Sequence, residues 1–123
     1  MLEFINIALQ LTAQVYGMGE LYCGDYNQKP QPCGYGAVMA SGAIFEPHLP
    51  IAAVPMPRNR ILRPTWICLQ GSKGQDVWIR LADKKHERYI GNIGFDLSPK
   101  AVELVTGKPA TRHWSGKVQE CES

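Results

Sequence analysis

The sequence predicts one mainly β domain with a single short helix near residues 98–107. Twelve glycines and nine prolines in 123 residues indicate many turns between short elements, which is typical of β proteins. A hydrophobic fraction of 45% with 20% charged residues indicates a globular chain rather than a disordered one. The length leaves room for one domain.

Several classes of function have no support in the composition. The formal net charge is only +2, and the charges are scattered, so we expect no nucleic-acid partner. No apolar run approaches the ~20 residues of a membrane helix, so we expect no membrane span. P-loop, dinucleotide, HExxH, GxSxG and CxxC motifs are absent from the sequence, and we therefore expect no cofactor and no metal.

The first twelve residues admit two interpretations. Large apolar residues alternate from Ile5 to Leu11, which predicts a strand with one buried face. This strand belongs either to the domain itself or to an N-terminal arm, residues 1–12, that docks on a partner subunit and precedes a domain at 13–123. The segment lacks the positive charges and cleavage site of an export signal, so no signal peptide is recognisable in it. Either a signal was removed upstream, or the protein reaches its site without one.

The middle of the chain predicts short strands. Small apolar residues at 34–45 indicate close backbone crossings. Residues 51–54 form a short buried strand between prolines. Residues 65–69 and 76–81 form two strands joined by a glycine-containing hairpin connection. The charged run 83–88 indicates a solvated loop, although it is charged enough to line a polar groove.

The helix has signals at both ends. Ser98 is a natural N-cap, Pro99 fits the first helical position, and Gly107 fits the position just past the end. Helical spacing predicts one buried stripe, which consists of Ala101, Leu104 and Val105. After the helix, residues 111–121 predict a closing strand.

Four cysteines permit three pairings, which sequence alone does not resolve. A bridge between Cys23 and Cys33 would close the polar loop between them. That leaves a bridge from Cys68 to Cys121, which would tie the C-terminal tail to the middle of the chain. The alternative is four free thiols in a reducing compartment.

Four segments, in the same order and at compatible spacing, carry a resemblance to a known family. They are residues 13–17 (AQVYG), 39–54 (MASGAIFEPHLPIAAV), 77–83 (VWIRLAD) and 94–98 (GFDLS). Together they resemble the RlpA-like double-psi β-barrels, distant kin of expansin and barwin domains. The resemblance implies a closed six-stranded double-psi β-barrel with a surface groove. It implies peptidoglycan or another polysaccharide as the ligand, outside the cytoplasm in the cell envelope or in a secreted protein.

The resemblance also implies site residues. In the family, an aspartate at the DLS position lies in the groove and is implicated in cleaving glycan strands. Here that residue is Asp96, which would act as the general acid of a lytic transglycosylase. The glycan-binding candidates beside it are Tyr16, His48 and Asp83.

Two environments are open for Asp96. A general acid must stay protonated near neutral pH, and the apolar neighbours Phe95 and Leu97 would favour that form. Alternatively, Asp96 accepts hydrogen bonds from backbone N–H groups before the helix, which favours the carboxylate.

Departures from the family pattern support a second hypothesis. Ala43 stands where the family has a glutamate, and Val54 stands where it has a histidine. In this hypothesis the groove has lost its chemistry, because two of its polar residues are replaced. The barrel would then be a non-catalytic structural subunit of a phage tail tip, a baseplate or another assembly of a virion. Aromatic side chains could stack on sugars, but strand alternation predicts that most are core. They are Tyr16, Tyr22, Trp66, Trp78, Tyr89 and Trp114.

Overall fold

A computed structural model describes residues 10–15, 38–46, 48–85, 95–111 and 114–122. Within these ranges the chain is mainly β, with six strands and one short helix, as the sequence predicts. Among the described residues, no helix is both long and apolar enough to cross a membrane. The elements are β1 (Gln10–Val15), β2 (Ile51–Pro55), β3 (Thr65–Gln70), β4 (Asp76–Lys85), β5 (Phe95–Leu97), α2 (Pro99–Thr106) and β6 (Ser115–Gln119).

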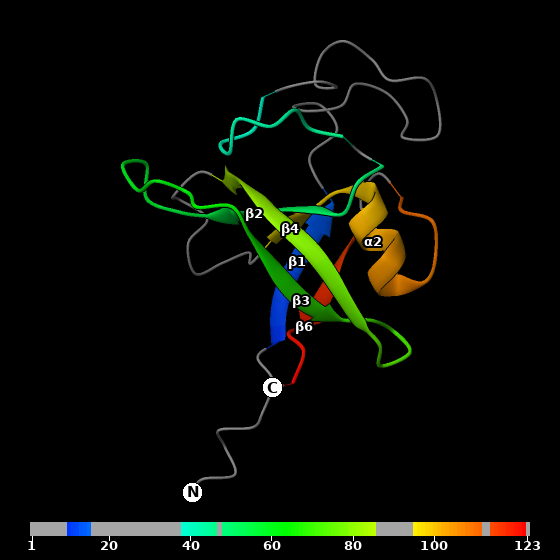
Figure 1. Cartoon of the computed structure of the whole chain (residues 1–123). Coiled ribbons are helices and arrows are strands. Elements are labelled where there is room, and N and C mark those ends of the chain that lie inside the picture. Colours follow the sequence, from blue (N-terminus) through cyan, green and yellow to red (C-terminus); the bar gives the residue numbers. More distant parts are fainter. Residues whose placement is uncertain (1–9, 16–37, 47, 86–94, 112–113, 123) are drawn as a thin grey trace, which may run out of the picture.

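The strands form one curled sheet with the order β3-β4-β2-β5-β1-β6 (Figure 1). Two pairs are parallel, β1 with β5 and β2 with β4, and the other three pairs are antiparallel. If β1, β2 and β3 are exchanged with β4, β5 and β6, respectively, the strand order becomes the same order read from its other end. Each pair also keeps its parallel or antiparallel orientation. The strand topology therefore has an internal two-fold pattern centred between β2 and β5.

A disulfide joins the two outer strands where the sheet curls back on itself. Cys68 on β3 is bonded to Cys121 just after β6, as predicted. The Cys121 N–H donates to the Cys68 carbonyl over 3.1 Å, and Leu69 forms a bridge with Glu120. The ends of β3 and β6 are thus held together covalently. The other predicted bridge, Cys23 to Cys33, lies outside the described residues.

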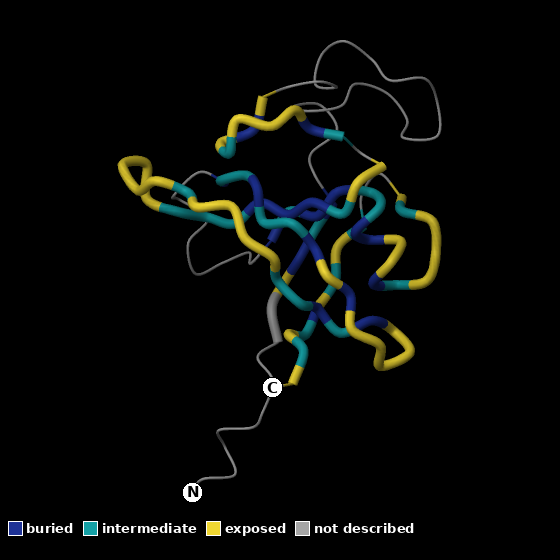
Figure 2. Tube along the Cα trace, viewed as in Figure 1, coloured by how far each residue is buried: buried dark blue, intermediate teal, exposed yellow. Residues whose placement is uncertain are grey.

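Buried side chains form two clusters, one on each face of the sheet. The larger cluster combines inward-facing residues of the strands with one side of α2. The smaller one packs residues 39 and 45 against the opposite face of β2 and β4; Figure 2 shows the buried backbone at the centre of the sheet. Its members are Met39, Phe45, Ile51, Ala53 and Ala82.

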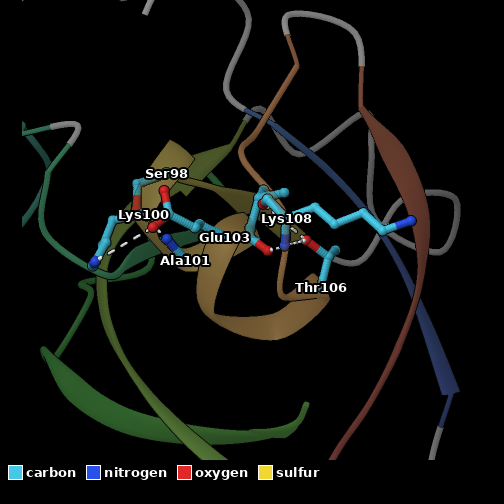
Figure 3. Close-up of polar contacts among 7 residues, drawn as sticks. Ser98, Lys100, Ala101, Glu103, Thr106 and Lys108 are labelled. Carbon is cyan, nitrogen blue, oxygen red and sulfur yellow. Dashed lines mark hydrogen bonds and ion pairs between the residues drawn. The ribbon is translucent and has the colours of Figure 1, made fainter. Parts of the chain in front are cut away.

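Helix α2 begins and ends as the sequence predicts (Figure 3). The Ser98 hydroxyl accepts from the Ala101 N–H, Pro99 occupies the first turn, and Gly107 takes a left-handed φ of 77°. The buried residues are Ala101, Val102 and Val105, so the predicted stripe is wrong at Leu104, which is exposed. These three buried residues pack on the sheet, which orients the helix.

Ser98 also connects α2 to the sheet. Its hydroxyl accepts from the Ile51 N–H over 3.0 Å and donates to the Leu49 carbonyl, while its side chain is fully buried. The Ser98 N–H donates to the Ile51 carbonyl. The start of β2 is therefore fixed to the start of the helix by three hydrogen bonds.

Strand β4 is longer than predicted. It runs to Lys85, so the solvated-loop interpretation is wrong for residues 83–85, and Lys85 is nearly buried. At the other end of the chain, residues 10–12 pair with β6, which places them in the sheet. The boundary expected between arm and domain thus falls inside β1, and residues 1–9 lie outside the described residues.

Candidate functional site

Four residues form a row across the centre of the sheet. Gln14 on β1 pairs with Asp96 on β5, Asp96 pairs with Ala53 on β2, and Ala53 pairs with Asp83 on β4. Directly paired residues share one face of a sheet. We call these four the carboxylate row. Two strand spacings separate the backbones of the aspartates, about 10 Å, and the small Ala53 side chain between them leaves space for both carboxylates.

A β-bulge places Asp83 in this row. Ala52 pairs with Leu81, but Ala53 pairs with Asp83, so Ala82 is the extra residue on β4. In a regular ladder Ala53 would face Ala82, and Asp83 would lie beside Val54. Bulges commonly redirect a side chain in this manner. The bulge therefore brings the second carboxylate onto the same face as Asp96.

Asp96 lies in a polar environment and not in the apolar one, the first of the two that the sequence left open. Its neighbours Phe95 and Leu97 are buried on the opposite face of β5, as strand alternation requires. The Asp96 Oδ1 lies 2.8 Å from Lys85 Nζ and accepts a hydrogen bond from Gln14 Nε2 over 3.0 Å. Lys85 is buried and Asp96 is partly buried, with side-chain exposures of 5% for Lys85 and 14% for Asp96. The ammonium stabilises the ionised carboxylate.

Asp83 has a different environment. Burial raises the pKa of its carboxyl above the ordinary value of 3.8, and the nearby charge of Asp96 acts in the same direction. Hydrogen bonds from the backbone N–H groups of Ala40 (3.0 Å) and Lys84 (2.9 Å) to its Oδ1 oppose that shift. The row thus holds one carboxyl whose pKa is raised by burial and one that is ion-paired. Such divergence is characteristic of acid–base sites.

A mostly apolar pocket of about 400 Å³ adjoins the row. Ile51 pairs with Arg80, and Arg80 pairs with Trp66. Ile51 is two residues before Ala53 on β2, so this set of paired residues lies about 7 Å along the strands from the carboxylate row. We call this the Trp66 pocket. It is lined by Met39, Ser41, Ala43, Ile44, Leu49, Pro50, Ile51, Pro64, Trp66, Arg80 and Ala82.

The other candidate residues are placed as follows. His48 is exposed before β2, and no contact with the aspartates is found among the described residues. Ala43, at the family's glutamate position, lines the Trp66 pocket, whereas Val54 packs against the core. Tyr16 lies outside the described residues. Of the candidates, the structure brings Asp83 and Asp96 into one row.

Two of the six aromatic residues, most of which were expected in the core, are exposed in the described part of the chain. Trp66 and Trp78 are 55% and 56% exposed, on the outer face of the β3–β4 hairpin. The inward positions of the hairpin are taken by Leu69, Val77 and Ile79. Alternation along each strand was the sequence signal that could have found this, because both tryptophans are out of phase with those residues. Lys85 was missed as well, since its contact with Asp96 is long-range.

Two other features were considered as sites. A cavity of about 570 Å³ lies beside the end of α2 and is lined by Lys108, Trp114 and Lys117. No carboxylate lines this cavity or the Trp66 pocket, but the Trp66 pocket includes Ile51 and Ala82 beside the carboxylate row, whereas this cavity includes no neighbour of the row. Among the described residues, one group of metal-type ligands lies close together, Cys68, Asp76 and Cys121. Its two sulfurs are bonded to each other, so they are not available as thiolate ligands.

Comparisons of the chain with protein-family models, with curated proteins and with solved structures gave no match.

Proposed function

We propose that this chain is a double-psi β-barrel protein of the RlpA-like type that binds peptidoglycan glycan strands and cleaves them as a lytic transglycosylase. The observation that carries the proposal is the placement of Asp83 and Asp96 on one face of the sheet beside an open pocket. The two-fold strand pattern and the ordered motifs at 13–17, 39–54, 77–83 and 94–98 support the same fold.

The reaction needs a proton donor and a stabiliser of positive charge. The donor protonates the glycosidic oxygen as the bond from the anomeric carbon to that oxygen breaks. The 6-hydroxyl of the same muramic acid then attacks the anomeric carbon and gives its proton to the donor's conjugate base, so no water is consumed. The product is an anhydro sugar.

The contacts in the row suggest how these roles are divided. Asp83 is the better proton donor, because burial raises its pKa. Asp96, ionised beside Lys85, is the better stabiliser of an oxocarbenium-like transition state. The resemblance alone would place the general acid at Asp96. On the contacts in the row, the proposal instead assigns the proton transfer to Asp83 and the electrostatic role to Asp96.

Mass spectrometry of purified peptidoglycan after incubation with the protein tests this proposal. The wild type should release anhydro-muropeptides, and Asp83→Asn and Asp96→Asn should each lower the rate at least about 100-fold. Asp76→Asn is the matched control, because Asp76 is an exposed aspartate on the same strand as Asp83 and should retain full activity. Absence of anhydro products from the folded wild type would refute cleavage.

One observation favours a second candidate, a non-catalytic subunit of a larger assembly such as a phage tail tip. Ala43 and Val54 are apolar where the family carries a glutamate and a histidine, and Ala43 lines the pocket itself. Deleting residues 1–9 tests this candidate, since β1 begins at Gln10 and stays intact. A folded truncated protein that loses assembly supports it. Unchanged assembly would contradict a docking role for this segment.

A further inference from the structure

The loop between β2 and β3 projects from the sheet and carries arginines around an exposed aliphatic side chain. It is the green loop to the left of the sheet in Figure 1, and Figure 2 shows its tip as exposed. Ile61 is 83% exposed, the largest exposed fraction of any large hydrophobic residue in the described part of the chain. Arg60 and Arg63 flank it, and both are exposed. We call residues 58–63 the arginine loop.

The charge around this loop has one sign. Residues 47–75 contain four Lys and Arg residues and no Asp or Glu, whereas the whole chain has 13 basic and 11 acidic residues. Neither Arg60 nor Arg63 forms an ion pair within the described part of the chain. The loop therefore presents positive charge to the solvent on both sides of an apolar side chain.

The backbone of the loop is held in place by hydrogen bonds. Lys84 on β4 donates from Nζ to the carbonyl of Arg58 over 3.1 Å and to that of Arg60 over 2.6 Å. The Arg60 N–H donates to the Pro57 carbonyl over 3.0 Å, and a second proline, Pro64, follows the loop. Prolines restrict the backbone at both ends. A loop that is ordered before it binds loses less conformational entropy on binding.

From these features we infer that the arginine loop attaches the protein to the surface of a bilayer that contains anionic lipids. Ile61 would enter the boundary between headgroups and acyl chains, and Arg60 and Arg63 would pair with lipid phosphates. The attachment is peripheral and involves no membrane-spanning segment. The inference is independent of the proposed function, because none of these residues belongs to the carboxylate row or lines the Trp66 pocket.

The shape of the loop favours a bilayer over a protein partner. Proteins typically bind a peptide in a groove or along a strand edge, but residues 58–63 line neither of the two cavities described above and form no strand. One projecting aliphatic side chain also offers little area, since a stable protein interface buries about 800 Å² on each partner. A bilayer accepts a single inserted side chain and surrounds it with anionic headgroups.

Co-sedimentation of the full chain with lipid vesicles tests the inference. Vesicles made of equal parts phosphatidylglycerol and phosphatidylcholine should bind the protein at least about tenfold more tightly than vesicles of phosphatidylcholine alone. The preference should disappear as the salt concentration rises to about 0.5 M. We expect a reversible attachment no stronger than that of a single acyl chain, about 10⁴ M⁻¹.

Variants of the loop separate the two contributions. Combining Arg60→Gln with Arg63→Gln should lower the partition coefficient for the anionic vesicles roughly 25-fold, which is about fivefold for each charge. Ile61→Ser should lower it roughly tenfold, whereas Ile61→Leu should preserve it. Lys73→Gln and Leu104→Ser are the matched controls. They replace an exposed cation beyond the other end of β3 and an exposed aliphatic residue on α2, and each should change partition by less than about twofold.

Several results would overturn the inference. Equal binding to both kinds of vesicle, no binding of the folded wild type to the anionic vesicles, or undiminished binding of the double arginine variant would each do so. Polyglutamate identifies the other class of partner. If it bound the wild type as tightly as the anionic vesicles do, and Ile61→Ser weakened neither interaction, the loop would be a site for acidic proteins. Because the substituted loop side chains are exposed, each loop variant should keep the wild-type Tm, which verifies that it is folded.

Discussion

Replacing Lys85 by methionine removes the ammonium that lies 2.8 Å from the Asp96 carboxylate. Loss of one partner from a buried ion pair typically costs about 3–5 kcal/mol. Gln14 still donates to the same oxygen, and Asp96 keeps an exposure of 14%, so the lower end of that range applies. We therefore expect a loss of about 3 kcal/mol, or about 12 °C in Tm for a domain of this size.

Urea and thermal unfolding under non-reducing conditions measure this loss. The matched control is Lys100→Met, which breaks an exposed ion pair of 3.7 Å with Glu103 and should cost no more than about 0.5 kcal/mol. Adding Asp96→Leu to Lys85→Met should restore most of the stability, because an apolar pair replaces the buried charges. A Tm for Lys85→Met within about 2 °C of the wild type would refute the reasoning.

Three further changes have expected outcomes. Ser98→Ala should cost about 2–3 kcal/mol in urea unfolding, because it removes the helix cap and leaves the first N–H of β2 without its acceptor; a cost below about 0.5 kcal/mol would contradict it. Replacing Cys68 and Cys121 by serine should cost about 4 kcal/mol for a sequence separation of 53 residues, and a reductant should lower the wild-type Tm similarly. Because the Asp83 pKa is raised on folding, its protonation contributes stability that is complete below pH 3.8 and is lost as the pH rises through the folded pKa. Asp83→Asn should thus gain stability relative to the wild type with rising pH, and an unchanged difference would contradict the raised pKa.

The elements that the sequence predicted correctly are those with local signals. The caps Ser98 and Gly107 act through hydrogen bonds within a few residues, so their positions are readable in the chain. Strand β2 and the β3–β4 hairpin have short apolar runs bounded by prolines or glycines. The Cys68–Cys121 bridge was one of the open pairings, and only the meeting of β3 with β6 decided it.

The site depended on contacts that no local signal encodes. Asp83 joins Asp96 only because Ala82 bulges out of the ladder, and the sequence 80–83 contains no glycine to mark that bulge. The ion pair joins residues 85 and 96 from strands that do not pair with each other, so it follows from the curl of the sheet. Sequence reasoning could name both aspartates, but it could not predict which one would be ion-paired.

The two-fold pattern of the strands has a consequence for any polymer that lies across the carboxylate row. The strand order and orientations read the same from either end, because the exchange that maps β1 onto β4 and β5 onto β2 also turns the row end for end. The bulge at Ala82 and the side chains distinguish the ends, with Gln14 at one and Asp83 at the other. Strand topology alone therefore does not fix the polarity of a bound chain, and its direction is set by the bulge and by the side chains of the row.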